Sequence, residues 1–152
     1  MSYVQEVLQP EESVRFRSNV HWFVYLKAIV ALLIAAALSV WYYVDGHENL
    51  FLLLGAIAFG VSAVVLAIPA WLKRLGTEVA VTDRRVIYKT GLIHRHTIEV
   101  NMDKVESVDV DQSIWGRLFG YGSITVRGTG EGIEPLRDIA HPIELRNAVM
   151  VR

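Results

Sequence analysis

The chain has 152 residues, a formal net charge of −1 and no cysteine. The near-neutral charge argues against a general nucleic-acid-binding protein, which needs a basic surplus to neutralise phosphates. The lack of cysteine excludes disulfides, thiolate metal sites and cysteine nucleophiles. Hydrophobic residues make up 53% of the sequence, and the mean hydropathy is +0.34. This excess over a typical soluble protein lies almost wholly between Trp22 and Leu72.

Residues 1–21 form a polar N-terminal segment that precedes the apolar region. Three glutamates lie in it, Glu6, Glu11 and Glu12, and no cationic stretch leads into a short apolar core. A cleaved signal peptide is therefore not expected. We assign residues 1–21 to a cytoplasmic N-terminal segment.

Two long apolar runs predict a transmembrane hairpin over residues 22–74, with helices at about 22–44 and 50–72. The first run has Lys27 as its only charge, and the second has none. Roughly 20 apolar residues cross the hydrocarbon core as a helix, because backbone amides have no other partner in lipid. Only Asp45–Asn49 separates the runs, so the helices are expected to be antiparallel neighbours. Buried helices of a soluble protein are the alternative, which two adjacent charge-poor runs disfavour.

Aromatic and basic residues at the ends of the runs are typical of membrane-interface anchors. The predicted anchors are Trp22, Lys27, Trp41, Tyr42, Tyr43, Trp71, Lys73 and Arg74. The loop between the runs has no lysine or arginine, whereas Arg15 and Arg17 precede the hairpin and Lys73 and Arg74 follow it. The excess of positive charge on one side predicts that both termini are cytoplasmic.

Small residues recur along one side of each run, a spacing that lets helix backbones approach closely. They are Ala31, Ala35 and Ser39 in the first run, and Ala56, Gly60, Ala63 and Ala67 in the second. This seam fits either the hairpin within one chain or contact between subunits.

Residues 75–152 show short alternating apolar patterns separated by turn residues, which predict a small β domain. The predicted strands are residues 77–81, 85–89, 92–100, 104–110, 123–128 and 133–139, with a flexible hairpin tip at 128–132. Ser113 is a candidate N-cap for one helical turn that Gly120 closes, and Pro142 is expected to open a short terminal helix. The fold class is therefore α+β: the hairpin, then a bent antiparallel sheet with a C-terminal helix.

Three stretches of this region resemble the bacterial pleckstrin-homology-like domain of small YdbS-type membrane proteins. They read TDRRVIYKTG (residues 82–91), DKVESVDVDQS (103–113) and WGRLFGYGSITVRG (115–128). The segment PEESVRFRSNVHW (10–22) before the hairpin is also similar to that family. The resemblance implies a strongly bent sheet of about seven strands capped by a C-terminal helix, in a prokaryotic inner-membrane protein whose domains assemble.

No arrangement of residues in the sequence predicts catalysis or a cofactor. His94 and His96 share one face of a strand, a spacing that zinc sites use, but no third ligand is evident nearby. The aspartates at 103, 109 and 111 lack the spacing of a calcium loop. No nucleophile elbow or phosphate-binding loop is present. We therefore expect no enzyme activity, no metal and no cofactor, and the sequence names no small-molecule ligand.

Two groups of residues are candidates for surface contacts. The basic residues Arg84, Arg85, Lys89 and Arg95 follow the second apolar run and are candidates for binding anionic lipid. Ordinary solvated sheet residues are the alternative, which the sequence favours. Trp115 and Arg117 are candidates for contact with a protein partner or with the bilayer, whereas Leu118 and Phe119 are expected to pack in the core.

Three functions remain open at this stage. The leading hypothesis is a non-enzymatic interaction module, anchored in the membrane, that binds identical subunits or another membrane protein. The first alternative is a domain that senses anionic lipid through its basic residues. The weaker alternative is a subunit of an oligomeric channel or transporter, because two helices cannot enclose a pore alone.

Overall fold

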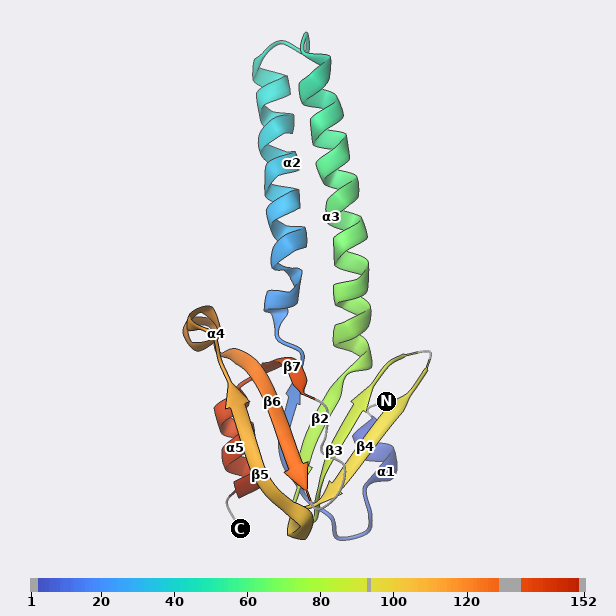
Figure 1. Ribbon diagram of the computed structural model, residues 1–152. Helices are drawn as coiled ribbons and strands as arrows, with labels where there is room; N and C mark the ends of the chain where they lie inside the picture. The colour runs from blue at the N-terminus through green and yellow to red at the C-terminus, as the bar shows by residue number, and fades with distance from the viewer. Residues whose placement is uncertain (1–2, 93, 129–134, 151–152) are drawn as a thin grey trace. The chain divides into compact units, whose positions relative to one another are not determined.

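The computed structural model describes residues 3–92, 94–128 and 135–150 (Figure 1). The chain divides into two compact units, residues 24–72 and residues 1–23 with 73–152. The predicted hairpin tip at 128–132 and the beginning of the strand predicted at 133–139 fall largely outside the described residues. The two units are described in turn.

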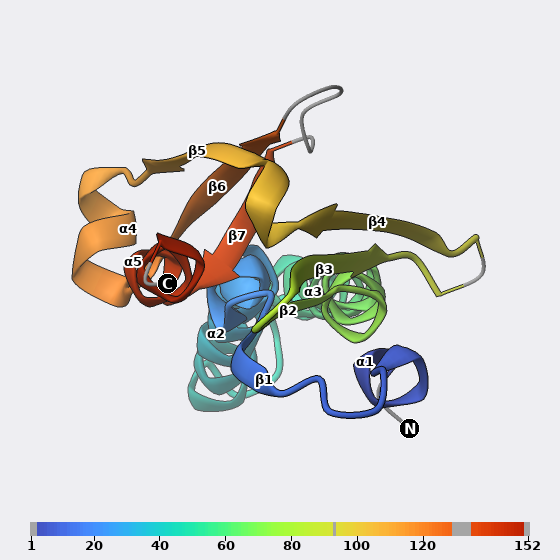
Figure 2. The ribbon, with the colours of Figure 1, turned by 90° about the horizontal axis from the view of Figure 1, so that it is seen from below.

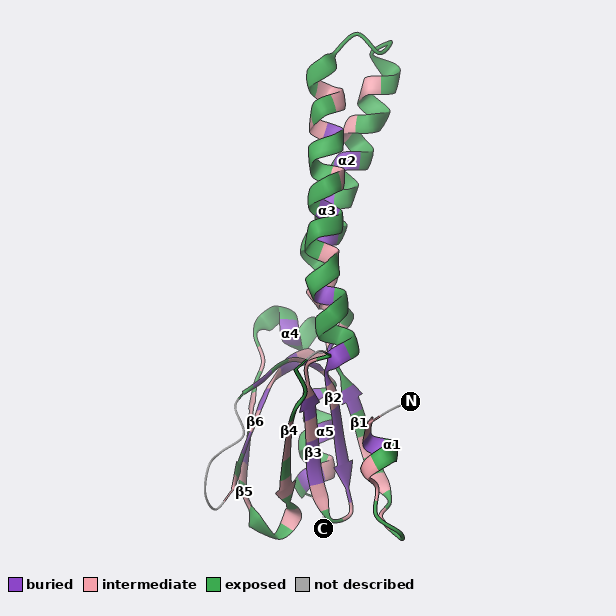
Figure 3. Cartoon of the chain, turned by 90° about the vertical axis from the view of Figure 1, so that its right-hand side faces the viewer, coloured by how far each residue is buried: buried purple, intermediate pink, exposed green. Residues whose placement is uncertain are grey.

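The first unit contains two long helices, α2 (Leu26–Val44) and α3 (Leu50–Gly76), and a 3₁₀ turn at Trp22–Tyr25 leads into α2. The ranges Trp22–Val44 and Leu50–Gly76 are both long and apolar enough to cross a membrane. Only 17% and 6% of their apolar windows are buried. Figure 3 colours most of both helices as exposed. Burial on this scale does not fit the core helices of a soluble protein, which hide most of their apolar surface.

The predicted second helix continues beyond residue 72 as α3, and Pro69 lies inside it without ending it. The buried residues are Ala28, Ala31 and Ala35 in α2, and Ala56, Ala63, Ala70 and the terminal Gly76 in α3. A Cβ on Gly55 of α3 would lie 3.2 Å from Leu38 of α2, so the two helices approach closely at this glycine. Of the predicted small residues, Ala31, Ala35, Ala56 and Ala63 are buried within the hairpin, whereas Ser39 is exposed.

The second unit begins with a four-stranded antiparallel sheet in the order β1-β2-β3-β4. Its strands are β1 (Val14–Asn19), β2 (Glu78–Thr82), β3 (Arg85–Thr90) and β4 (His96–Asn101). β1 pairs with β2 from Val14↔Thr82 to Asn19↔Glu78. The assignment of residues 1–21 to a separate segment, with a domain confined to 75–152, is therefore wrong. The segment before the hairpin supplies an edge strand of the domain.

A second, three-stranded antiparallel sheet has the order β5-β6-β7. Its strands are β5 (Val105–Asp111), β6 (Tyr121–Gly128) and β7 (Leu136–Ala140). An isolated bridge from Val20 to Ile139 links the end of β1 to β7. The domain thus has seven strands among its described residues, and the predicted bent antiparallel arrangement is confirmed.

The main core lies between the two sheets and is closed by α5 (Pro142–Met150), which packs against β5, β1 and β6 and is seen end-on in Figure 2. Strand residues such as Val81, Val86 and Ile124 are fully buried in it. Leu145 and Val149 of α5 point into the same cluster. The terminal helix predicted at Pro142 is confirmed, and its apolar side is the one that covers the core.

A short N-terminal helix, α1 (Tyr3–Val7), packs against the other face of the first sheet. Val4 of α1, Ala80 of β2 and Ile87 of β3 are all buried but belong to no part of the main core. Ala80 and Ile87 are direct cross-strand partners, and they alternate with the core-facing residues of their strands. The N-terminal segment therefore covers the outer face of this sheet.

Candidate functional site

Arg85, one of the predicted lipid contacts, lies in an ion-pair network under the N-terminal segment. Its Nε and Nη2 atoms donate to the two carboxylate oxygens of Glu12 at 2.9 and 2.7 Å. Its Nη1 donates to Glu99 at 2.8 Å, and Nη2 also donates to the carbonyl of Val7 at 2.9 Å. The side chain of Arg85 is 14% exposed and that of Glu12 is 0% exposed. This bidentate geometry leaves Arg85 little capacity to bind a lipid headgroup.

Glu12 is held in its charged form. It accepts hydrogen bonds from Arg85, from the Thr82 hydroxyl at 2.8 Å and from the Gln9 amide at 3.0 Å. The hydrogen bond from Arg85 is the main reason that the pKa of Glu12 falls to about 2, although burial opposes the shift. The pKa of Arg85 is raised in turn, chiefly by its hydrogen bond to Glu12. The network fastens the N-terminal segment to the sheet.

The remaining predicted lipid contacts do not form one basic surface. Lys89 is buried, and its Nζ lies 5.5 Å from the centre of the Tyr3 ring. Arg95 is exposed, and its guanidinium carbon lies 5.0 Å from the centre of the same ring. Tyr3 of α1 therefore contacts both cations. Arg84 is exposed at the opposite end of β3. Three of the four cations, Arg85, Lys89 and Arg95, thus contact residues of the N-terminal segment, which the sequence pattern alone did not reveal.

The histidine and aspartate candidates form no metal centre within the described residues. His94 and His96 are exposed, and no group of three or more potential ligands occurs in that part of the chain. Asp109 instead pairs with Arg127 across neighbouring strands at 3.2 Å.

The helical turn predicted after Ser113 is α4 (Ile114–Phe119). The Ser113 side chain accepts a hydrogen bond from the Gly116 amide, and Gly120 ends the helix with φ of 76°. Both predicted cap positions are confirmed.

Ile114, Trp115 and Leu118 of α4 are largely exposed, and Phe119 packs in an aromatic cluster outside the main core. The expectation that Leu118 and Phe119 pack in the core is therefore wrong. Ile114 is 85%, Trp115 62%, Leu118 71% and Phe119 40% exposed. The reason is Gly116, the buried residue of α4, whose Cβ position would lie 2.5 Å from the Tyr121 carbonyl oxygen. Because α4 contacts β6 through Gly116, the apolar side chains of Ile114, Trp115 and Leu118 face outward.

An aromatic cluster joins α4 to the residues that lead into the first long helix. The ring of Phe119 lies 5.4 Å from that of Phe23 and 6.1 Å from that of Trp22. Phe23 also stacks on Tyr121 of β6 at 4.4 Å, and His21 stacks on the same tyrosine at 5.5 Å. Burial lowers the pKa of His21, and the neutral ring accepts a hydrogen bond from the Phe23 amide at 3.2 Å.

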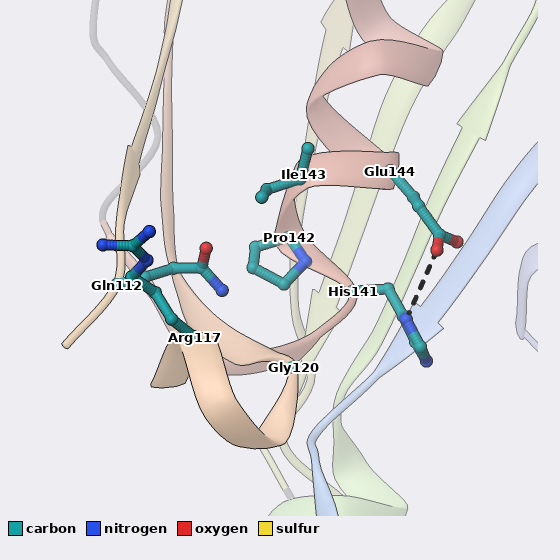
Figure 4. Close-up of a pocket in the computed structure, with 7 residues that line it drawn as sticks. All are labelled: Gln112, Arg117, Gly120, His141, Pro142, Ile143 and Glu144. Atoms are coloured by element: carbon teal, nitrogen blue, oxygen red, sulfur yellow. Dashed lines mark ion pairs between the residues drawn. The ribbon is translucent and has the colours of Figure 1, made fainter. Parts of the chain in front are cut away.

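A groove runs between α4 and the start of α5, as Figure 4 shows. It has a volume of about 240 Å³ and is lined by Gln112, Arg117, Gly120, His141, Pro142, Ile143 and Glu144. His141 and Glu144 lie 3.5 Å apart on one rim. A second hollow of about 530 Å³ continues along β5 between Val108 and Arg146, and it shares Gln112 and Ile143 with the first.

The groove and the neighbouring hollow combine apolar and polar side chains, an arrangement suited to binding. Their polar side chains are Gln112, two arginines, Asp109 and the exposed pair of His141 and Glu144. The second hollow lies along β5, which within the described residues pairs only with β6. The sequence analysis identified Arg117 but missed the groove, because residues 112 and 143 meet only after the chain has folded.

The predicted interface anchors lie mostly on exposed helical surface. Trp22, Trp41, Tyr43 and Trp71 are exposed, as are Lys27, Lys73 and Arg74. Tyr42 and Tyr43 both contact the ring of His47 in the loop between the long helices, at 5.0 and 5.1 Å. Their exposure is compatible with interface anchoring, which remains a prediction.

Comparison with known proteins supports the resemblance found in the sequence. The family model described as bacterial PH domain matches residues 19–151, which covers most of the chain and includes both long helices. The chain therefore belongs to the bacterial PH domain family. Searches of curated proteins and of solved structures gave no match.

Proposed function

We propose that this protein holds its PH-like domain at a membrane surface, where the domain acts as a non-enzymatic interaction module. The observation that carries this proposal is the exposed apolar surface of α2 and α3, including Leu33, Phe51 and Val64. Exposing such surface to water costs about 25 cal/mol per Å², whereas lipid removes this cost. The distribution of lysine and arginine supports placing the domain on the cytoplasmic side of a prokaryotic inner membrane.

The edge of β5 and the groove beside α5 are the proposed interaction surface. An unpaired strand edge offers backbone amides and carbonyls to an incoming extended segment. The groove adds apolar contact through Ile143 and positive charge through Arg117 and Arg146. A second copy of this chain is the proposed partner, because two copies anchored in one membrane hold their grooves at the same height and at high effective concentration.

The alternatives receive less support. Lipid sensing through the four basic residues is disfavoured because Arg85 is paired with Glu12 and Lys89 is buried. A pore-lining role needs polar groups along the long helices. The hydroxyls of Ser39 and Ser62 instead donate to Ala35 and Ala58 of their own helices, each at 2.8 Å. We therefore retain the interaction module.

A photo-crosslinking amino acid at Ile143, in cells that hold tagged and untagged copies of the chain, tests this proposal. We expect adducts between tagged and untagged copies, because Ile143 lines both parts of the groove. Leu92 is the matched control, since it has similar exposure, 48% against 54% for Ile143, and lies outside the groove. If Ile143 gave no more adducts between copies than Leu92, or if the copies never co-purified, self-association through the groove would be wrong.

A further inference from the structure

We infer that α4 is a third membrane contact, which inserts Ile114, Trp115 and Leu118 into the boundary between headgroups and acyl chains. The inference rests on the proposed membrane anchoring and adds a lipid-binding surface on the folded domain itself. It also assigns Trp115 to lipid, whereas the sequence left lipid and protein partners open.

The first argument is the exposure of α4. Three large apolar residues of one six-residue helix are each more than 60% exposed. Single exposed apolar residues are ordinary, but a contiguous group marks an interaction surface. The helix has no acidic residue, and its one charged residue is Arg117. A tryptophan and an arginine beside aliphatic side chains fit a headgroup region, where the indole and the guanidinium both find polar partners.

The second argument is the position of α4 within the domain. Phe119 packs against Trp22 and Phe23, and Trp22 is the first residue of the first candidate membrane span. The exposed apolar face of α4 is thus continuous with the point where the chain enters the proposed membrane. The surface of a bilayer is the apolar phase that this location puts nearest to α4.

The third argument is that the residues just before and just after the hairpin, His21 and Lys73, both contact the same strand of the domain, β7. The His21 amide donates to the carbonyl of Asp138 at 2.7 Å, and Lys73 Nζ pairs with the Asp138 carboxylate at 2.6 Å. Asp138 has φ of 62°, an uncommon conformation for a residue other than glycine. This one residue of β7 contacts the chain on both sides of the hairpin. The entry and exit points of the hairpin therefore belong to one end of the domain, and α4 belongs to that end.

A third contact would fix the tilt of the domain relative to the bilayer. Burying the side chains of α4 in lipid would oppose a change of this tilt, because lifting them into water exposes apolar area again. It would also hold the groove beside Arg117 at one height above the membrane.

Spin labels on the full chain test this inference. The protein has no cysteine, so a nitroxide can be placed at one introduced cysteine without other changes. The test sites are Leu118→Cys and, in a separate protein, Ile114→Cys, each reconstituted in phosphatidylcholine vesicles. Val64→Cys on α3 reports lipid, and Glu106→Cys on β5 reports water. The measurement is the collision rate with oxygen, which concentrates in lipid, against that with a water-soluble nickel chelate.

We expect the ratio of oxygen to nickel collisions at residues 114 and 118 to exceed that at 106 several-fold and to approach that at 64. A nickel-dominated signal at 114 and 118, like that at 106, would overturn the inference and leave α4 in water. Low collision rates with both reagents would also overturn it, because a protein surface would then cover α4. If residue 64 also showed no contact with lipid, the membrane anchoring itself would be wrong, so the two failures are distinguishable.

Discussion

Replacing Glu12 with glutamine is expected to lower the free energy of unfolding of the domain by roughly 3 kcal/mol, because it breaks a buried ion pair and leaves Arg85 with one carboxylate partner. Glutamine keeps the size of the side chain but removes the negative charge that two nitrogens of Arg85 contact. Urea titration of the protein in detergent micelles, followed by hydrogen exchange of β3 amides, measures the change.

Glu6→Gln is the matched control for this prediction. It removes the same charge from the same N-terminal segment, but the Glu6 side chain is exposed. Surface changes of this kind usually alter stability by less than about 0.5 kcal/mol. Equal effects of the two substitutions would show that the Glu12–Arg85 pair does not hold the N-terminal segment in place.

The same pair predicts loss of stability in acid. Glu12 has a lowered pKa of about 2 in the folded domain, against 4.5 for the ordinary side chain. A lowered folded pKa stabilises the protein above pH 4.5, and this contribution disappears as the pH falls from about 4.5 to about 2. We expect the stability of the Glu12→Gln variant to depend less on pH in this window. A parallel decline in the two proteins would contradict the assigned pKa.

Replacing Ile124 with alanine is expected to lower the free energy of unfolding by about 2–5 kcal/mol, since it opens a cavity in the centre of the main core. Ile124 is fully buried on the middle strand β6, where Val110 and Leu136 are its cross-strand partners. The same urea titration measures the change. Ile143→Ala is the control, because it removes the same atoms from a side chain that is 54% exposed. Equal losses for both variants would show that the two sheets do not enclose this residue.

Local patterns in the sequence predicted the two long helices, α4, α5 and most of the strands, whereas α1 was not predicted. The charge-poor runs gave the two long helices, and Ser113, Gly120 and Pro142 gave the ends of α4 and the start of α5. Each of these features depends on residues close together in the chain. The strand predicted at 92–100 begins later, at His96, because the chain turns tightly at Gly91. A Cβ at Gly91 would collide with the carbonyl oxygen of His94.

Features that depend on distant residues could not be read from the sequence. β1 reaches its partner β2 only after the chain has passed through the whole hairpin, and Glu12 meets Arg85 across the same interval. Arginines at 15 and 17 also gave the β1 segment a polar, loop-like composition. The outward face of α4 depends on the fit of Gly116 against Tyr121, which a pattern of apolar residues does not show.

Extraction of cell membranes tests the central claim, that α2 and α3 anchor the domain in a lipid bilayer. We predict that the full chain stays in the membrane pellet after an alkaline carbonate wash, which strips peripheral proteins, and that it dissolves only when detergent is added. Recovery of the chain from the wash as a folded monomer in detergent-free buffer would contradict the account, because its long helices would then be stable in water.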